Sequence, residues 1–369
     1  MIRKFTLRYF IIVLLTFFIH FPVFSQIPSS QPTLTEIEKK GIIGRELIFH
    51  RKYDEALAYF KKLESEYPGS PLGTFGQMAI WQSRMFENYD FQFDREYMEV
   101  SDRNRAIVSQ VLDQPNSSSW DLFLAGASSG IRSFYLMRKD AAFKALGESN
   151  KSEKALKKAL EKEPGFKDIY LGLGMYDYWR SVFTNRLKFL PFFSDKRPEG
   201  LQEIEIALKE GRVVGALAGV SLAFCYYEQR NYTKAIPYLL EIVKNYPENV
   251  IAKNLLGDFY LMKGNFNEAH PIFDEILKNN PEVYVAKFFK ATAYLRQNQW
   301  VLARQGYEDF LKSNPSPAWT SYALTDLGRI DLKEGKTEAA FEHFKKASRV
   351  YPDNPTPLKE LNKLREKRW

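Results

Sequence analysis

Apolar residues recur with a helical period over much of the chain. The spacing stays near 3.6 residues in four stretches of its first half, at 77–100, 104–113, 119–138 and 151–162. This period places apolar side chains along one face of a helix, where they can pack against neighbouring helices. The pattern therefore predicts a mainly helical protein.

A second, longer pattern runs through residues 213–354. Four alanines, Ala235, Ala269, Ala303 and Ala340, are spaced 34, 34 and 37 residues apart, and each is followed twelve residues later by a proline. Twelve residues before each alanine stands another alanine or a glycine, and four residues after it stands a bulky residue. Such a period predicts a repeated pair of helices that must stack on its neighbours, because one pair alone cannot bury its apolar face.

These landmarks resemble those of the tetratricopeptide repeat, a helix–turn–helix unit of about 34 residues. The resemblance implies an all-α fold, a right-handed superhelical solenoid of such repeats, with four tandem repeats in 213–354. The same landmarks recur alone in 37–70, which we expect to be the first repeat. Between them, 71–212 is expected to hold divergent helical, repeat-like units with an insertion at 181–197.

Packing inside each unit follows from the residue types. We expect the small residue and the alanine to let the two helices cross closely, with the bulky residues filling the space between units. Pro237 and Pro271 fall two residues after their alanines, and they would lie in a first helical turn if those helices began near Thr233 and Glu268. Three residues between paired helices tolerate a left-handed turn: Gly264, Asn298 and Gly335.

The two ends of the chain differ from the repeats. Residues 1–25 combine a basic start, an apolar run and a loosened small-residue cleavage pattern. This pattern predicts a signal peptide that is cleaved near Ser25/Gln26, and export to the periplasm. A retained N-terminal membrane anchor is the alternative. Residues 26–36 are expected to be a linker. At the other end, 355–369 is expected to cap the last repeat, with Leu358, Leu361 and Leu364 on its apolar face.

Composition narrows the classes of function. The net charge of +8 falls to +5 without the three basic residues of 1–25, and the remainder is scattered, which gives no support for a nucleic-acid partner. The single cysteine, Cys225, excludes an internal disulfide and a multi-cysteine zinc site. The insertion 181–197 interleaves aromatic and basic residues, so it is either a partner or membrane-surface contact or a cover for the solenoid flank.

No catalytic or cofactor motif has its required context. Gly126-Ala-Ser-Ser-Gly130 matches a nucleophile elbow as a string, but it follows a helical stretch rather than a buried strand. Cys225 lies one residue before Tyr226, at a repeat position that is also tyrosine at Tyr260 and Tyr294. Its thiol is expected to fill apolar space in the core. His50, His270 and His343 have no second ligand at helical spacing, so no metal site is predicted. We therefore expect no enzyme activity and no cofactor.

A binding role remains. In the repeat family, the first helix of each unit lines a groove that holds a peptide or a partner helix, and the resemblance carries this role to positions in 213–354. The cationic members could attract an acidic segment or a carboxylate. The predicted groove residues are Tyr227, Asn254, Asp258, Phe288, Arg296, Arg329 and Lys333. We expect a protein-binding scaffold of the bacterial cell envelope, or alternatively an envelope assembly factor that touches the membrane surface through 181–197.

Overall fold

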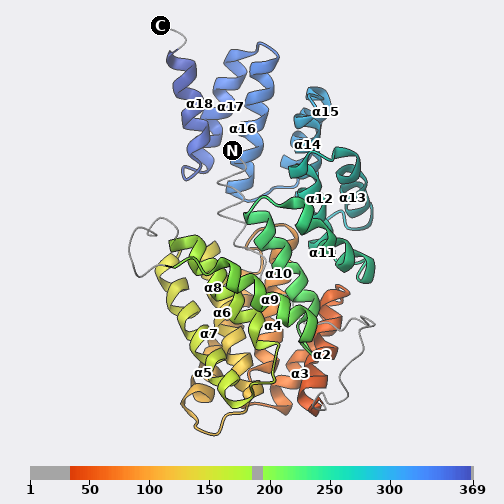
Figure 1. Cartoon of the computed structure of the whole chain (residues 1–369). Helices are drawn as coiled ribbons and strands as arrows, with labels where there is room; N and C mark the ends of the chain where they lie inside the picture. The colour runs from red at the N-terminus through yellow and green to blue at the C-terminus, as the bar shows by residue number, and fades with distance from the viewer. Residues whose placement is uncertain (1–33, 185–193, 367–369) are drawn as a thin grey trace. The chain divides into compact units, whose positions relative to one another are not determined.

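The fold is all-α in the part of the chain that the structure describes. A computed structural model describes residues 34–184 and 194–366, and within them it has helices and no strand (Figure 1). The helices are α2 (Glu36–Phe49), α3 (Tyr53–Glu66), α4 (Leu72–Glu87), α5 (Asp94–Asp113), α6 (Ser119–Arg138), α7 (Ala142–Lys162), α8 (Ile169–Thr184), α9 (Arg197–Glu210), α10 (Gly215–Glu228), α11 (Tyr232–Asn245), α12 (Val250–Lys263), α13 (Phe266–Asn279), α14 (Val285–Arg296), α15 (Trp300–Leu311), α16 (Pro317–Lys333), α17 (Thr337–Val350) and α18 (Pro355–Glu366).

The described residues form two compact units. One contains residues 34–86 and 91–252, and the other contains 87–90 together with the chain from 253 onward. In both units, helices that follow one another in the sequence pack as pairs, as the repeat pattern predicts. The chain is thus an all-α protein of helical repeats of the solenoid type.

In two of the tandem repeats, the small residue packs against the bulky residue of the same repeat. A Cβ atom added to Gly257 would lie 2.6 Å from the ring of Phe273, and one added to Gly328 would lie 2.7 Å from the ring of Phe344. Phe273 also stacks on Phe289 of the next repeat, with ring centroids 5.7 Å apart, so the bulky residue fills space between units, as expected, and packs inside its own unit as well. The ring occupies the space left by the missing side chain, so the two helices of one repeat interlock.

The turns inside the repeats share one backbone conformation. Gly264, Asn298 and Gly335 have φ values of 90°, 60° and 76°, which confirms the left-handed turn predicted there. In each case the following N–H donates to a carbonyl five residues earlier, as in Asn265 N–H to Tyr260 O at 2.8 Å. This bond closes a helix end whose carbonyl would otherwise lack a partner.

The pair α6–α7 belongs to the same series. Asp140 between them has φ 56°, the N–H of Ala141 donates to the carbonyl of Leu136 at 2.9 Å, and Ala145 follows Asp140 by five residues, as Ala269 follows Gly264. In the tandem repeats a proline follows the alanine by twelve residues, but here Pro164 stands seven residues beyond that position. The reason is that α7 has 21 residues where α13 has 14. Two extra helical turns therefore hid this repeat in the sequence.

Two details differ from the sequence-based expectations. The second helices begin at Tyr232 and Phe266, earlier than expected, so Pro237 and Pro271 lie inside α11 and α13 rather than in the first turn. In α18, the buried residues are Pro357, Leu361 and Leu364, whereas Leu358 is 49% exposed. Leu361 and Leu364 lie on one helix face with Pro357, at a spacing of four and three residues, and Leu358 lies outside this stripe.

The insertion 181–197 is described only at its two ends, and residues 185–193 lie outside the described part, as do 1–33 and 367–369. The backbone N–H of Lys196 donates to Ser181 Oγ at 2.9 Å, so the insertion leaves and rejoins the fold at one place. Lys196 and Arg197 pair with Asp177 and Asp195. No helix in the described ranges is long and apolar enough to cross a membrane.

Candidate functional site

The seven predicted groove residues lie on four first helices of the repeats. Tyr227 is on α10, in the unit that contains 91–252, and the other six are on α12, α14 and α16 in the unit that contains the chain from 253 onward. The structure therefore brings together at most six of them. The candidate site is considered on this unit alone.

The uncharged groove candidates are buried. Tyr227, Asn254 and Phe288 are each less than 9% exposed, and the ring of Phe288 lies 4.7 Å from that of Trp319 in an aromatic cluster. The Asn254 amide donates to the carbonyl of Glu87 at 3.1 Å. Asp258 is also buried. These side chains build the interior of the repeats, because the stacked neighbours cover them.

Arg296 and Lys333 remain exposed at equivalent positions. Each stands seven residues before the alanine of its repeat, Ala303 or Ala340, so the two occupy the same place on consecutive first helices. The guanidinium of Arg296 also donates to the carbonyl of Leu261 at the end of α12. Equivalent positions in stacked repeats form a row on one face of the array.

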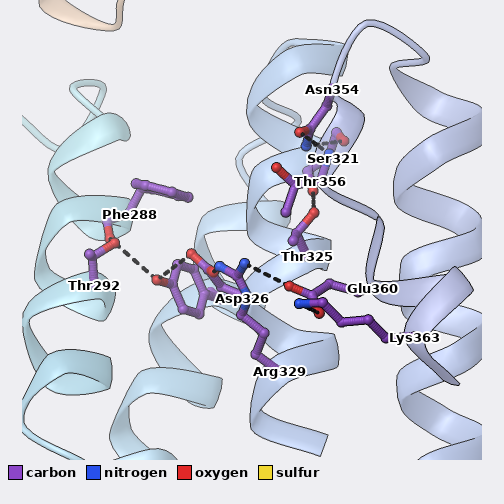
Figure 2. A network of polar contacts seen from close by, with 11 residues as sticks. Phe288, Thr292, Ser321, Thr325, Asp326, Arg329, Asn354, Thr356, Glu360 and Lys363 are labelled. Atoms are coloured by element: carbon purple, nitrogen blue, oxygen red, sulfur yellow. Dashed lines mark hydrogen bonds and ion pairs between the residues drawn. The ribbon is translucent and has the colours of Figure 1, made fainter. Parts of the chain in front are cut away.

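Arg329 is held in an internal network. Its guanidinium donates to Asp326 at 2.8 Å and to Glu360 of α18 at 3.3 Å, as Figure 2 shows. The hydroxyl of Tyr307 donates to the second oxygen of Asp326 at 3.1 Å and lies 2.9 Å from the hydroxyl of Thr292. The network links α14, α15, α16 and α18. Arg329 is therefore engaged in joining the last repeats and the capping helix.

Burial dominates the protonation of this network. It raises the pKa of the Asp326 carboxyl, although Arg329 and the bond from Tyr307 lower it in part. Burial also raises the pKa of the Tyr307 hydroxyl well above its usual range, with the Asp326 charge acting in the same direction. The raised pKa of Tyr307 keeps its hydroxyl protonated, so that it can donate the hydrogen bond to Asp326.

Asp331 stands three residues after the small residue of its repeat, Gly328, at a position where the other three tandem repeats have a tyrosine. Its buried carboxylate lies 2.7 Å from Arg304 of α15 and 2.6 Å from Nδ1 of His343 on α17. An ion pair between helices thus stands where the aromatic ring stands in the other copies. Among the described residues, no group of three or more His, Cys, Asp or Glu side chains could hold a metal ion.

The motif-like strings lie in structural positions. Gly126–Gly130 is inside α6, and Ser128 is buried and accepts from the Asn104 amide at 3.1 Å. Because no strand–turn–helix is present there, the string does not form a nucleophile elbow. Cys225 is fully buried in α10, and burial raises the pKa of its thiol well above the usual value. A thiol in this setting is unreactive.

Comparison with known proteins identifies the repeats of the later part of the chain. The tetratricopeptide repeat profile matches residues 226–284 and 260–318, in register with the landmarks described above. The chain contains tetratricopeptide repeats. Repeats of this kind suggest a protein–protein interaction scaffold. No curated protein sequence matches this tetratricopeptide-repeat chain.

Solved structures share the repeat fold. The Cut9–Hcn1 hetero-tetramer of the APC/C is similar with a TM-score of 0.58 at 12% identity, covering 90% of this chain and 57% of the Cut9–Hcn1 chain. This chain thus spans just over half the length of that protein. PilF of Pseudomonas aeruginosa has a TM-score of 0.45 at 19% identity, and the match covers 64% of this chain and 97% of PilF. A tetratricopeptide repeat protein of Parabacteroides merdae has a TM-score of 0.46 at 18% identity, and the match covers 79% of this chain and 98% of that protein. The first of these likenesses supports the fold alone.

Proposed function

We propose that this protein is a non-catalytic scaffold of the bacterial cell envelope that binds a partner protein through the first helices of its last repeats. The observation that carries the proposal is the pair of exposed cations, Arg296 and Lys333, at equivalent positions of consecutive repeats. An acidic segment of a partner could form charge-assisted hydrogen bonds with both. Partner binding by the seven predicted residues stays a prediction, and it now depends mainly on these two.

The proposal predicts that reversing these two charges weakens partner binding. The variant Arg296→Glu/Lys333→Glu, made in residues 26–369, is expected to bind its partner at least tenfold more weakly, because a repulsive pair replaces an attractive one. The partner is first identified by affinity capture from envelope extracts, and binding of the purified pair is then measured by calorimetry. Arg329 is left unchanged because its guanidinium binds the carboxylates of both Asp326 and Glu360. Its loss would leave these two carboxylates without their shared cation and would disturb the fold.

A matched control reverses two charges on second helices. Lys278 and Lys346 are exposed on α13 and α17, so Lys278→Glu/Lys346→Glu changes the net charge equally on helices that do not carry the proposed face. The control is expected to bind as the unmodified protein does. Equal weakening in both variants would show a non-specific charge effect, and unchanged binding in both would remove the first-helix face as the site.

A further inference from the structure

An apolar cavity lies within the α6–α7 repeat and its neighbour α8. It has a volume of about 600 Å³, and its walls come from α6, α7 and α8, with Val214 and Leu217 closing part of it. Every helix that forms it belongs to one compact unit. This volume falls in the range of about 300–1,000 Å³ that is typical of small-molecule sites.

The cavity exists because this repeat lacks its bulky residue. Four residues after the repeat alanine stand Phe60, Phe273 and Phe344 in other repeats, where each ring packs on the small residue of the paired helix. In the α6–α7 repeat, the corresponding residues are Ser149 and Ser133, and both line the cavity. Two small side chains stand at the positions that a ring and a glycine occupy elsewhere, so space is left between the helices.

The cavity lining extends along α7. It runs from Ala142 to Leu156, which at 1.5 Å per residue is about 21 Å of helix. An extended hydrocarbon chain can lie along such an apolar wall and bury its methylene groups against it.

One end of the cavity opens at an apolar rim. Phe143 is 94% exposed, and Leu146 and Phe183 are also exposed, although all three are large apolar side chains. Exposed apolar side chains grouped at the mouth of a cavity mark a binding site rather than a random surface. At the opposite end of the lining on α7, Leu156 packs against Gly126 and Gly172, so we place the entrance at the exposed end, past Phe143.

A positive charge stands at the rim. Arg180 is exposed and lines the cavity, with its guanidinium carbon 5.8 Å from the centre of the Tyr176 ring. Tyr176 also donates to the side chain of Asn150 at 3.1 Å, so polar groups gather on this side of the cavity. An apolar interior with a cation at its mouth complements a molecule with a hydrocarbon tail and an anionic head.

We propose that the α6–α8 cavity binds the acyl chain of a free long-chain fatty acid, with the carboxylate near Arg180. The tail lies along α7 between Leu156 and Phe143, and it occupies the space that a phenylalanine fills in other repeats. This site is separate from the proposed protein-binding face and stands on different residues.

Two substitutions of one residue test the proposal. Binding of palmitate to residues 26–369 is measured by calorimetry for the unmodified protein, Ser149→Phe and Ser149→Ala. Ser149→Phe restores the ring of the other repeats and is expected to weaken binding at least tenfold, because its ring takes up space in the cavity. Ser149→Ala keeps the space and is expected to bind within about twofold of the unmodified protein. Equal affinity of the unmodified protein and both variants for palmitate would overturn the proposal.

A rim variant keeps the test valid if Ser149→Phe does not fold. Leu146 is about half exposed, so Leu146→Asp is compatible with folding, and its carboxylate would repel that of palmitate. Binding is expected to fall at least tenfold, while thermal unfolding stays unchanged. Binding equal to that of the unmodified protein would contradict the proposed entrance.

Two further measurements distinguish a fatty acid from other occupants of the cavity. Flotation with phosphatidylglycerol vesicles, in the absence of palmitate binding, would assign the apolar rim to a bilayer surface and overturn the proposal. A variant in which a Gly/Ser linker replaces residues 185–193 tests whether the chain's own segment competes. Palmitate binding by this variant alone would assign the cavity to that segment, and equal binding by both proteins supports the fatty acid.

Discussion

At the scale of single residues, the repeats depend on an interlock between one small and one bulky side chain. Gly257 and Phe273 form it in one unit, and Gly44 and Phe60 form it in the first repeat. The spacing of these residues from the repeat alanine was visible in the sequence. Their mutual contact was not, because spacing along the chain gives the helix face but not the residue that meets it.

The interlock predicts that Gly257→Ala destabilises the protein. Its new Cβ would lie 2.6 Å from the Phe273 ring, so the free energy of unfolding is expected to fall by about 1–3 kcal/mol. Gly147→Ala is the control, since Gly147 is an exposed residue of α7 with no atom within 4 Å of the added Cβ. This change is expected to stabilise the protein by about 0.5–1 kcal/mol. Urea unfolding measures both, and a shift of the same sign in the two variants would contradict the interlock.

At the scale of elements, the turn inside each repeat follows from local chemistry, while the helix lengths do not. A left-handed residue followed five positions later by alanine identifies the turns at Gly264 and, less visibly, at Asp140. An aspartate tolerates this left-handed conformation, but its presence in a sequence predicts such a turn less strongly than a glycine does. The extra length of α7 then shifted the closing proline, so the sequence indicated divergent repeat-like units in 71–212 but not the register of the α6–α7 repeat.

The capping helix α18 gives a second prediction at this scale. Leu361 and Leu364 pack in one buried cluster with Ala340 and Phe344 of the last repeat, whereas Leu358 is half exposed. Leu361→Ala is expected to lower the free energy of unfolding by about 2–5 kcal/mol, because it leaves a cavity against Phe344. Leu358→Ala is expected to change it by less than about 0.5 kcal/mol. Similar losses in both variants, measured by thermal or urea unfolding, would contradict the assigned buried face.

At the scale of the whole molecule, each unit is held by contacts between distant parts of the sequence. The Asn88 side chain accepts from the N–H of Val285 at 3.2 Å and donates to the carbonyl of Glu282 at 3.0 Å, so it caps the start of α14. Tyr284 donates to Asp90 at 2.8 Å. Residues 87–90 thus belong to the unit formed by the chain from 253 onward. No repeat pattern in the sequence indicates this.

Export is a further prediction for the whole chain. Residues 1–25 have the pattern of a signal peptide, and the proposed scaffold role in the envelope requires that they direct the chain out of the cytoplasm. We expect the mature protein in a bacterial host to begin near Gln26 and to appear in the periplasmic fraction. N-terminal sequencing of the fractionated protein measures this. An intact N-terminus in the membrane fraction would support a retained anchor, and an intact N-terminus in the cytoplasm would remove the envelope role.

The sequence by itself determined the all-α class, the repeat period and the turn residues. These depend on interactions within about 34 residues, where spacing and backbone preference suffice. Only the tertiary structure decided which predicted groove residues are buried, how residues 87–90 join the later repeats, and where the α6–α8 cavity lies. Each of these depends on which residues from separate parts of the chain meet, such as Asn88 with Val285. Such meetings are set by packing in three dimensions and leave no period along the chain.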